Sequence, residues 1–328
     1  MTDPTLVTGA GGFIGGHLVK DLLSKGHSVR AVDIKPQAEW HQVFADADNR
    51  TADLREADAC AQAVAGTGRV FNLAADMGGM GFIESHKADC MLSVLINTHL
   101  LQAAVAARVE RFFFGSSACV YAAEHQTSPD VTPLREEDAY PAMPEDGYGW
   151  EKLFSERMCR HFTEDFGLET RVARYHNVYG PQGTFEGGRE KAPAAICRKV
   201  AEAELLGHRE IEIWGDGRQT RSFMFIDDCI AGTHGIMDSD VAEPLNLGSA
   251  SLVTIDELVS IVEEIAGVKL ERRYKPDAPT GVRGRNSDNA KLNDALGWEP
   301  NTTLRDGLEV TYAWVRDQVR ASRPLPVS

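Results

Sequence analysis

The chain has few cysteines, and none is spaced as in a metal site or a disulfide framework. Six cysteines are scattered over 328 residues without a single Cys-x-x-Cys pair. This spacing argues against a zinc site and against a small disulfide-bonded scaffold. We therefore expect no bound metal, and we expect most of the cysteines to be small buried residues.

Long apolar runs and an excess of positive charge are also missing. No stretch of about 18 consecutive apolar residues is present to span a bilayer, and the chain enters a strand-like segment at once, without a signal peptide. The 34 basic residues are outnumbered by 49 acidic ones, for a net charge of −15. We expect a cytoplasmic protein that binds neither membranes nor nucleic acid, so any anionic ligand needs a local group of Lys and Arg.

What the sequence does contain is a regular alternation of short apolar strands and helices. Hydrophobic residues make up 43% of the chain, which is enough for a large core. Strands are predicted over 5–8, 28–33, 69–73, 111–115, 170–175 and 222–226, and helices over 13–25, 93–109, 148–166 and 192–206. This order predicts an α/β fold with a Rossmann-type doubly wound parallel sheet.

A glycine-rich turn lies between the first strand and the first helix. Gly9, Gly12 and Gly15 permit a tight turn and let the backbone at the helix N-terminus approach a pyrophosphate. Asp33 ends the next strand, where a carboxylate accepts hydrogen bonds from a ribose 2′-hydroxyl and repels a 2′-phosphate. NAD is therefore favoured over NADP, although Lys35 is close enough to weaken that preference. The predicted cofactor contacts are Gly9, Gly12, Phe13, Ile14, Gly15, Asp33, Asp53, Leu54, Ala74, Tyr148 and Lys152.

The composition changes after residue 175, where a Gly-rich loop and several Pro and Trp residues follow. We assign residues 1–175 to the NAD-binding Rossmann domain, with a returning segment near 222–248. Residues 176–221 and 249–328 are assigned mainly to a smaller, discontinuous α/β substrate-binding lobe.

Tyr148 and Lys152 are four residues apart at the start of a predicted helix, so they project from one face. A phenol has a pKa of about 10 and is a poor base at neutral pH, but an adjacent ammonium group favours its ionised form. With the hydroxyl of Ser116 or Ser117 as a partner, the pair would remove a proton from an alcohol while a hydride leaves to NAD. The alternative is a helix-start Tyr with an unrelated surface Lys, and the glycine turn argues against it.

Several short motifs together resemble the extended short-chain dehydrogenase/reductase superfamily over essentially the whole chain. They are Thr-Gly-x-x-Gly-x-x-Gly, Leu-Ala-Ala-Asp, Ser-Ser-Ala, Tyr-x-x-x-Lys and Asn-Val-Tyr-Gly-Pro. Within that superfamily, five longer segments are similar to the GDP-mannose 3,5-epimerases. These segments are 74–82, 116–119, 187–195, 214–222 and 281–288.

The resemblance implies an NAD-dependent isomerase that converts GDP-mannose to GDP-L-galactose, with GDP-L-gulose as a second candidate product. Carbon 4 of the hexose is oxidised, carbons 5 and 3 are inverted, and carbon 4 is reduced again. A ketone at carbon 4 acidifies both neighbouring carbons, and each inversion needs a base on one face and an acid on the other. Cys119 and Lys191 match the family's cysteine and lysine. As a base, Cys119 needs a nearby cation or helix N-terminus to favour its thiolate.

The nucleotide diphosphate needs cationic ligands, for which arginine is well suited. At most one of Arg283 and Arg285 needs to contact the phosphate. For each of them the alternative is an exposed charge in a surface loop with no role in binding. Glu190 would contact sugar hydroxyls or tune Lys191, and Met80 would shape the sugar pocket. The predicted substrate contacts are Gly79, Ser116, Ser117, Cys119, Asn177, Glu190, Lys191, Lys199, Gln219, Arg221, Arg283 and Arg285.

Three other functions compete with this one. The superfamily's 4,6-dehydratases carry an Asp-Glu pair where this chain has Ala118 and Cys119, so dehydration is disfavoured. A UDP-sugar 4-epimerase would leave Cys119 and Lys191 without a role. A binding module that senses NAD or a nucleotide sugar would show no turnover. The resemblance also implies a homodimer, paired through helices 93–109 and 148–166, although packing on the sheet explains an apolar stripe equally well.

Overall fold

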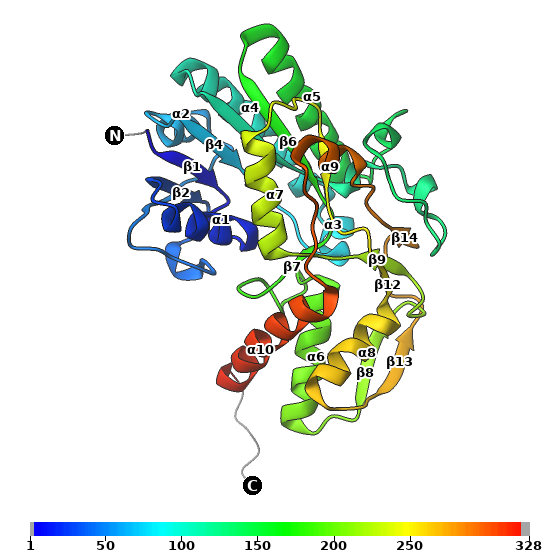
Figure 1. Cartoon of the computed structure of the whole chain (residues 1–328). Helices are drawn as coiled ribbons and strands as arrows, with labels where there is room; N and C mark the ends of the chain where they lie inside the picture. The colour runs from blue at the N-terminus through cyan, green and yellow to red at the C-terminus, as the bar shows by residue number, and fades with distance from the viewer. Residues whose placement is uncertain (1–2, 323–328) are drawn as a thin grey trace.

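A seven-stranded parallel sheet forms the centre of the computed structural model, which describes residues 3–322 (Figure 1). The strand order is β11-β6-β5-β4-β1-β2-β3. The strands are β1 (Thr5–Thr8), β2 (Val29–Asp33), β3 (Asp48–Thr51), β4 (Arg69–Asn72), β5 (Arg111–Ser117), β6 (Glu169–Tyr175) and β11 (Leu245–Leu247). The order reverses between β1 and β4, and the crevice at such a reversal is where doubly wound sheets bind ligands.

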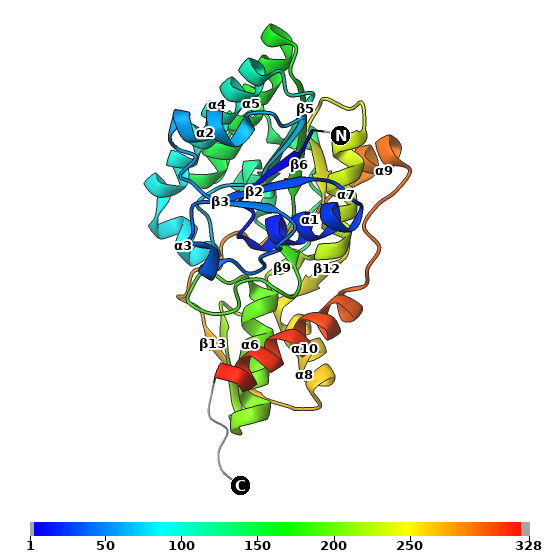
Figure 2. The same cartoon turned by 90° about the vertical axis from the view of Figure 1, so that its left-hand side faces the viewer.

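Helices cover both faces of this sheet, as Figures 1 and 2 show. One face carries α1 (Phe13–Ser24) and α7 (Ile226–Asp238), and the other carries α2 (Ala57–Val64), α4 (Lys87–Ala107) and α5 (Tyr148–Phe166). Leu6 and Val7 are adjacent on β1 and fully buried, yet they belong to two different core clusters. Successive strand residues point to opposite faces, so a sheet covered on both sides needs continuous apolar strands.

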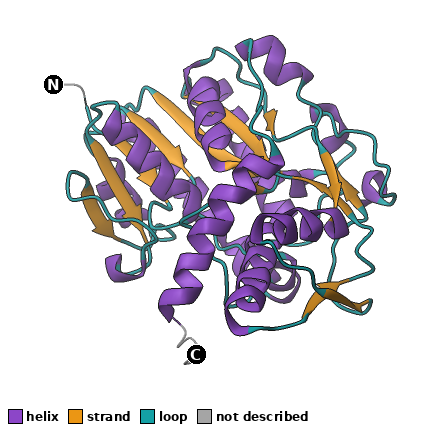
Figure 3. Ribbon diagram, turned by 60° about the horizontal axis from the view of Figure 1, so that its bottom comes forward, coloured by secondary structure: helices purple, strands orange, loops and turns teal. Residues whose placement is uncertain are grey.

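A second, smaller lobe continues the core (Figure 3). Three of its helices pack together, namely α6 (Ala192–Leu206), α8 (Ile255–Ala266) and α10 (Leu304–Ser322). Its other elements are β8 (Glu210–Trp214) paired with β13 (Glu271–Lys275), and the sheet of β12 (Leu252–Thr254), β9 (Thr220–Ser222) and β14 (Gly284–Arg285). Helix α9 (Ala290–Leu296) instead packs against β11 of the main sheet. Buried residues of this helix group and of α1 and α7 form one cluster, so the two lobes share a continuous apolar core.

The fold class is confirmed, and one strand prediction is wrong. The apolar segment 222–226 does not form a strand of the main sheet, because Ser222 ends β9 and β10 (Met224–Phe225) pairs only with β7 (Val178–Tyr179). The strand that returns to the main sheet is β11, which pairs with β6. Apart from short 3₁₀ helices, three elements of the first half, β3, α2 and α3 (Met80–Ser85), have no counterpart among the predicted ones. The division of the chain into two parts also includes residues 1–2 and 323–328, which lie outside the described range.

We expected no segment long and apolar enough to span a bilayer, and helix α4 differs from that expectation. Among the described residues it alone has the length and composition that could cross a membrane. Polar residues interrupt its sequence, so a search for an unbroken apolar run does not find it. In the structure α4 packs against α2 and α5, with Leu100, Leu101 and Ala104 in the core beneath them. Core helices of folded domains share this length and composition, so the feature is only weak evidence for a membrane. All six cysteines are buried and unpaired, as expected for most of them.

A buried polar network lies where β6 meets β11. His176 follows β6, is fully buried, and shares the Oδ1 atom of Asn246, at 3.0 Å, with the hydroxyl of Tyr121, at 2.6 Å. The other ring nitrogen, Nδ1, has no hydrogen-bond partner. Burial, with smaller contributions from Arg285 and Arg174, lowers the pKa of His176 to about 3. The folded protein therefore keeps this imidazole neutral at pH values where an exposed histidine is charged.

This network predicts a loss of stability on the acid side. Below the ordinary histidine pKa of about 6.5 the unfolded chain binds a proton that the folded protein does not, so stability present above that pH is lost as the pH falls toward 3. We expect the wild-type free energy of unfolding to fall by about 2 kcal/mol more than that of His176→Gln between pH 7 and pH 5. Urea titrations of both proteins at the two pH values measure this difference. Equal decreases would contradict the assignment.

Candidate active site

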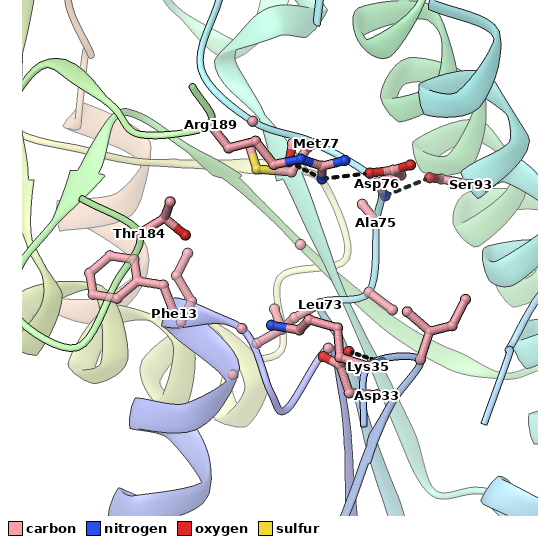
Figure 4. Close-up of a pocket in the computed structure, with 18 of the residues that line it drawn as sticks. Phe13, Asp33, Lys35, Leu73, Ala75, Asp76, Met77, Ser93, Thr184 and Arg189 are labelled. Atoms are coloured by element: carbon pink, nitrogen blue, oxygen red, sulfur yellow. Dashed lines mark hydrogen bonds and ion pairs between the residues drawn. The ribbon is translucent and has the colours of Figure 1, made fainter. Parts of the chain in front are cut away.

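A cavity of about 800 Å³ opens at the carboxyl edge of the main sheet. The glycine turn, the ends of β2, β4 and β5, the start of α5 and the segment after β6 all contribute to its wall. Figure 4 shows part of this wall, with Phe13 and Asp33 on one side and Thr184 and Arg189 approaching from the other lobe. The cavity therefore lies at the reversal of strand order and between the two lobes.

Two positions of the glycine turn must be glycine, because backbone atoms come too close for a side chain. Gly9 has φ of +67°, and a Cβ there would lie 2.8 Å from the carbonyl oxygen of Leu73. A Cβ on Gly15 would lie 2.1 Å from the carbonyl oxygen of Gly9. The first turn of α1, whose N–H groups lack partners within the helix, therefore reaches the cavity wall at Phe13 and Ile14. This geometry suits a pyrophosphate.

Asp33 is held at the far end of the turn. Its Oδ2 accepts a hydrogen bond from the N–H of Gly11 at 3.0 Å, and its Oδ1 accepts one from the N–H of Lys35 at 3.0 Å. The Lys35 ammonium group donates to the carbonyl of Gly11 at 2.7 Å, so it is drawn back to the turn. Asp53 is bound by the guanidinium of Arg55, which lowers the pKa of that carboxyl. Every residue predicted to contact the cofactor lines the cavity.

Tyr148 and Lys152 are buried at the start of α5 and also line the cavity. The Lys152 Nζ atom lies 5.4 Å from the centre of the Tyr148 ring and 3.6 Å from the Oε2 atom of Glu151. Burial raises the pKa of Tyr148 well above 10, and a hydrogen bond with Ser117 only partly opposes this. Contrary to the simple expectation, Lys152 therefore does not by itself make the phenol a base at neutral pH.

The structure distinguishes between the two serines that follow one another on β5. Ser116 donates to Glu156 at 2.5 Å in the core. Both serines line the cavity, but the hydroxyl of Ser117 is the one that acts on the Tyr148 phenol and partly offsets the rise in its pKa, so Ser117 is the better hydroxyl partner. The sequence does not single out Glu151. Its carboxyl accepts from Ser155 at 3.0 Å, and burial raises its pKa. A glutamate inside the Tyr-x-x-x-Lys motif gives no sequence signal of burial.

Cys119 and Lys191 come from different lobes, and of the two only Lys191 lines the cavity. Cys119 lies in a short 3₁₀ helix, Ala118–Val120, directly after β5, and is 6% exposed beside Tyr148. Burial, followed by the charge of Glu145, raises the pKa of this thiol to about 11, against an opposing contribution from Arg285. Lys191 is the N-cap residue of α6 and lines the cavity, and burial lowers the pKa of its amine. The two groups interact electrostatically.

The other eight predicted substrate contacts, like Cys119, lie outside the described cavity wall. Lys199 donates to the carbonyl of Glu212 at 2.7 Å, and Arg283 is 39% exposed and forms an ion pair with Asp216 at 3.0 Å. Arg221 donates to three carbonyls, those of Thr220, Thr280 and Val282. These cations are therefore occupied within the lobe. The remaining such residues are Gly79, Asn177, Glu190, Gln219 and Arg285.

Four of these five residues contact nearby backbone groups, three by hydrogen bonds and one by close packing. The Asn177 side chain donates to the carbonyl of Ser222 at 3.0 Å, and that of Gln219 donates to the carbonyl of Trp214 at 2.8 Å. Glu190 accepts from the N–H of Gly188 at 2.6 Å. Gly79 is needed for close packing, because a Cβ there would lie 2.6 Å from the Glu190 carbonyl oxygen.

An ion pair that the sequence did not predict joins the two lobes across the cavity. Arg189 donates to the carboxylate of Asp76 at 2.9 Å, and the N–H of Asp76 donates to Ser93 at 3.0 Å (Figure 4). The Arg189 guanidinium also lies 3.7 Å from the centre of the Phe82 ring. Both charged residues line the cavity. Asp76 and Arg189 are each part of a motif noted in the sequence, but 113 residues separate them.

Comparison with known proteins agrees with this geometry. Residues 5–248 match the model of the NAD dependent epimerase/dehydratase family. The chain is 46% identical over 318 residues to GDP-mannose 3,5-epimerase 1 of rice, covering 97% of this chain and 82% of the relative. Its structure resembles UDP-glucose 4-epimerase of Thermotoga maritima with UDP-glucose, with a TM-score of 0.86, 26% identity and coverage of 97% and 100%.

A second solved structure adds the cofactor. MoeE5 in complex with UDP-glucose and NAD resembles this chain with a TM-score of 0.78 and 30% identity, over 96% of this chain and 99% of that one. The matched family segment runs from β1 to the end of β11 and contains the glycine turn, Tyr148, Lys152 and Lys191. The chain therefore belongs to the NAD dependent epimerase/dehydratase family.

Proposed function

We propose that this protein is an isomerase that inverts GDP-mannose at carbons 3 and 5. The rice relative bears the name of that activity and aligns with 97% of the chain. One observation carries the proposal. A Tyr-Lys-Ser group suited to oxidising an alcohol lies beside Cys119 on the sheet, and Lys191 faces it from the other lobe. Redox chemistry alone does not need the last two groups.

NAD fits the cavity by the shape of the glycine turn and by the placement of Asp33. The close approaches at Gly9 and Gly15 leave room for a pyrophosphate at the start of α1. The carboxylate of Asp33 would receive the adenosine ribose, and its charge would repel a 2′-phosphate. When bound, NAD supplies a hydride acceptor for carbon 4 of the hexose and a hydride donor for its later reduction.

Tyr148 is the proton acceptor for the hydroxyl at carbon 4. Ser117 acts on its phenol, and Lys152, whose Nζ atom lies 5.4 Å from the centre of the Tyr148 ring, would bind the nicotinamide ribose and favour the phenolate. Burial raises the pKa of the phenol, so Tyr148 keeps the proton it has taken until reduction of carbon 4 forms an alkoxide, a stronger base that takes the proton back. The same residue thus serves both halves of the cycle.

Cys119 and Lys191 perform the inversions. Once carbon 4 is a ketone, the hydrogen on a neighbouring carbon is acidic because the carbanion is delocalised as an enolate. The Cys119 thiolate takes that proton and becomes a thiol, and the Lys191 ammonium delivers a proton to the opposite face and becomes an amine. Proton exchange with water, which removes the proton from the thiol and returns one to the amine, restores both groups before the second inversion. Burial lowers the pKa of Lys191 and so strengthens it as an acid.

UDP-sugar 4-epimerisation is the second candidate. The Thermotoga maritima structure is named for that reaction and matches the whole fold, but at 26% identity. Such a reaction requires the hydride to leave one face of carbon 4 and return to the other. It gives no role to Cys119 or Lys191.

Isotope exchange at the hexose carbons reports the two inversions directly. In heavy water, wild-type protein with GDP-mannose should incorporate deuterium at carbons 3 and 5, as followed by proton NMR of the hexose. Cys119→Ala should slow this incorporation at least about a hundredfold, because the proton acceptor is gone, while bound NAD is still reduced by the substrate. Tyr148→Phe should abolish that reduction.

The controls separate the steps. Cys159→Ala removes another buried cysteine, which lies in α5 and does not line the cavity. This variant should incorporate deuterium at carbons 3 and 5 as the wild type does. Normal exchange in Cys119→Ala would remove Cys119 from the mechanism. Conversion of a UDP-sugar at carbon 4, with no exchange into GDP-mannose, would favour the second candidate.

We further propose a homodimer formed through α4 and α5. These helices pack side by side and expose a group of large apolar side chains. The group consists of Met91, Leu92 and Leu95 on α4, and Trp150 and Phe154 on α5. Exposed apolar side chains grouped on neighbouring helices are a common site of association, and such a contact would account for the apolar side chains that α4 exposes.

The dimer has a direct test by light scattering coupled to size exclusion. Wild-type protein should have twice the mass of the chain, and the double variant Leu95→Glu/Phe154→Glu should be monomeric because two charges would be buried at the interface. Val310→Glu, at an exposed apolar position on α10, is the matched control and should remain dimeric. A monomeric wild type would contradict the proposal.

A further inference from the structure

Arg285 is a buried arginine whose contacts all lead to the neighbourhood of Cys119. It lies on β14 and is 6% exposed. Its Nε atom donates to Oε1 of Gln126 at 2.6 Å, its Nη1 atom lies 3.7 Å from the Cys119 sulfur, and its Nη2 atom lies 3.5 Å from the Glu145 carboxylate. Three of its nitrogen atoms are thus directed at this cluster, and Arg285 does not line the cavity.

Glu145 is attached to Cys119 through the backbone. Its N–H donates to the carbonyl of Cys119 at 2.9 Å. Gly149, four residues later, packs so closely that a Cβ there would lie 2.3 Å from the same carbonyl oxygen. The segment before and at the start of α5 is therefore fixed to the cysteine. The Glu145 side chain is 19% exposed, so it connects the cluster to solvent.

A second arginine, Arg221, lies next to Arg285 but does not take its place beside the thiol. Arg221 lies opposite Arg285 in the register of β9 and β14. Its guanidinium is occupied by the carbonyls of Thr220, Thr280 and Val282. Arg285 is therefore the cation that contacts the thiol directly. The charged and titratable groups that act on Cys119 are Arg285, Glu145, Lys191, Arg221 and Tyr148.

We infer that Arg285 is a positioning residue that stabilises the thiolate of Cys119, and that Glu145 holds Arg285 in place while opposing that thiolate with its own charge. This inference rests on the proposed role of Cys119 as a base. It replaces the expectation that Arg285 binds the diphosphate. A base buried without a cation would remain a thiol, because burial favours the neutral form.

The two charges act in opposite directions, which gives a sharp test. Arg285→Gln removes a positive charge and should move the ionisation of Cys119 to higher pH. Glu145→Gln removes a negative charge and should move it to lower pH. At pH values well below the pKa of the thiol, a change of about 1 in that pKa changes the thiolate fraction about tenfold. Arg285→Lys keeps the charge and should remain close to wild type.

The experiment measures alkylation of Cys119 by iodoacetamide between pH 7 and pH 10 in the full-length protein, with the modified peptide quantified by mass spectrometry. At a fixed pH we expect alkylation to be about tenfold slower in Arg285→Gln and about tenfold faster in Glu145→Gln than in the wild type. Arg273→Gln is the charge-matched control, because it removes an exposed arginine of β13 that forms an ion pair with Glu210 of β8. Its rate of Cys119 alkylation should equal that of the wild type.

Two results would overturn the inference. One is an unchanged pH profile in both Arg285→Gln and Glu145→Gln, and the other is a displacement of both profiles in the same direction. If Arg285→Gln fails to fold, as judged by circular dichroism, Glu145→Gln alone must still move the profile to lower pH. Alkylation needs no turnover, so absence of hexose exchange in the wild type would refute the proposed function without affecting this measurement.

Discussion

A buried ion pair between Arg174 and Glu156 is the contact on which the geometry of the site depends. Two hydrogen bonds, of 2.9 and 2.7 Å, join the side chains, and Ser116 donates a third to the same carboxylate. Together they hold β5, β6 and α5 at one point in the core. Removing one partner of such a pair leaves an uncompensated charge and costs about 3–5 kcal/mol. The pair therefore fixes how α5 presents Tyr148 to the end of β5.

Around that fixed point, the interior favours the neutral forms of the reacting groups. Burial raises the pKa of Tyr148 and of Cys119, and it lowers the pKa of Lys191. The acidities of a phenol, a thiol and an ammonium group are thereby brought into a range in which protons pass between them and a sugar. Specific charges then act on individual groups: for Cys119, the charge of Glu145 raises the pKa of the thiol and that of Arg285 lowers it.

The two lobes divide these tasks. The main sheet supplies the glycine turn, Tyr148 and Cys119, whereas the smaller lobe supplies Lys191 and Arg285. A continuous apolar cluster runs from the sheet into α6, α8 and α10. Groups on opposite sides of the cavity are consequently held by one packed core, and the Asp76–Arg189 ion pair connects the lobes again at the cavity wall.

The sequence by itself determined what depends on near neighbours in the chain. The turn at Gly9–Gly15, the helix that starts at Tyr148 and the sheet strands of the first half follow from local spacing and apolar pattern. The polar edge strand β3, with the sequence Asp-Asn-Arg-Thr, has no such pattern and could not be predicted from it. Only the tertiary structure brought Arg285 to Cys119, across 166 residues, and paired the guanidinium of Arg221 with backbone carbonyls. Charge and burial depend on what packs nearby in space, which spacing along the chain does not encode.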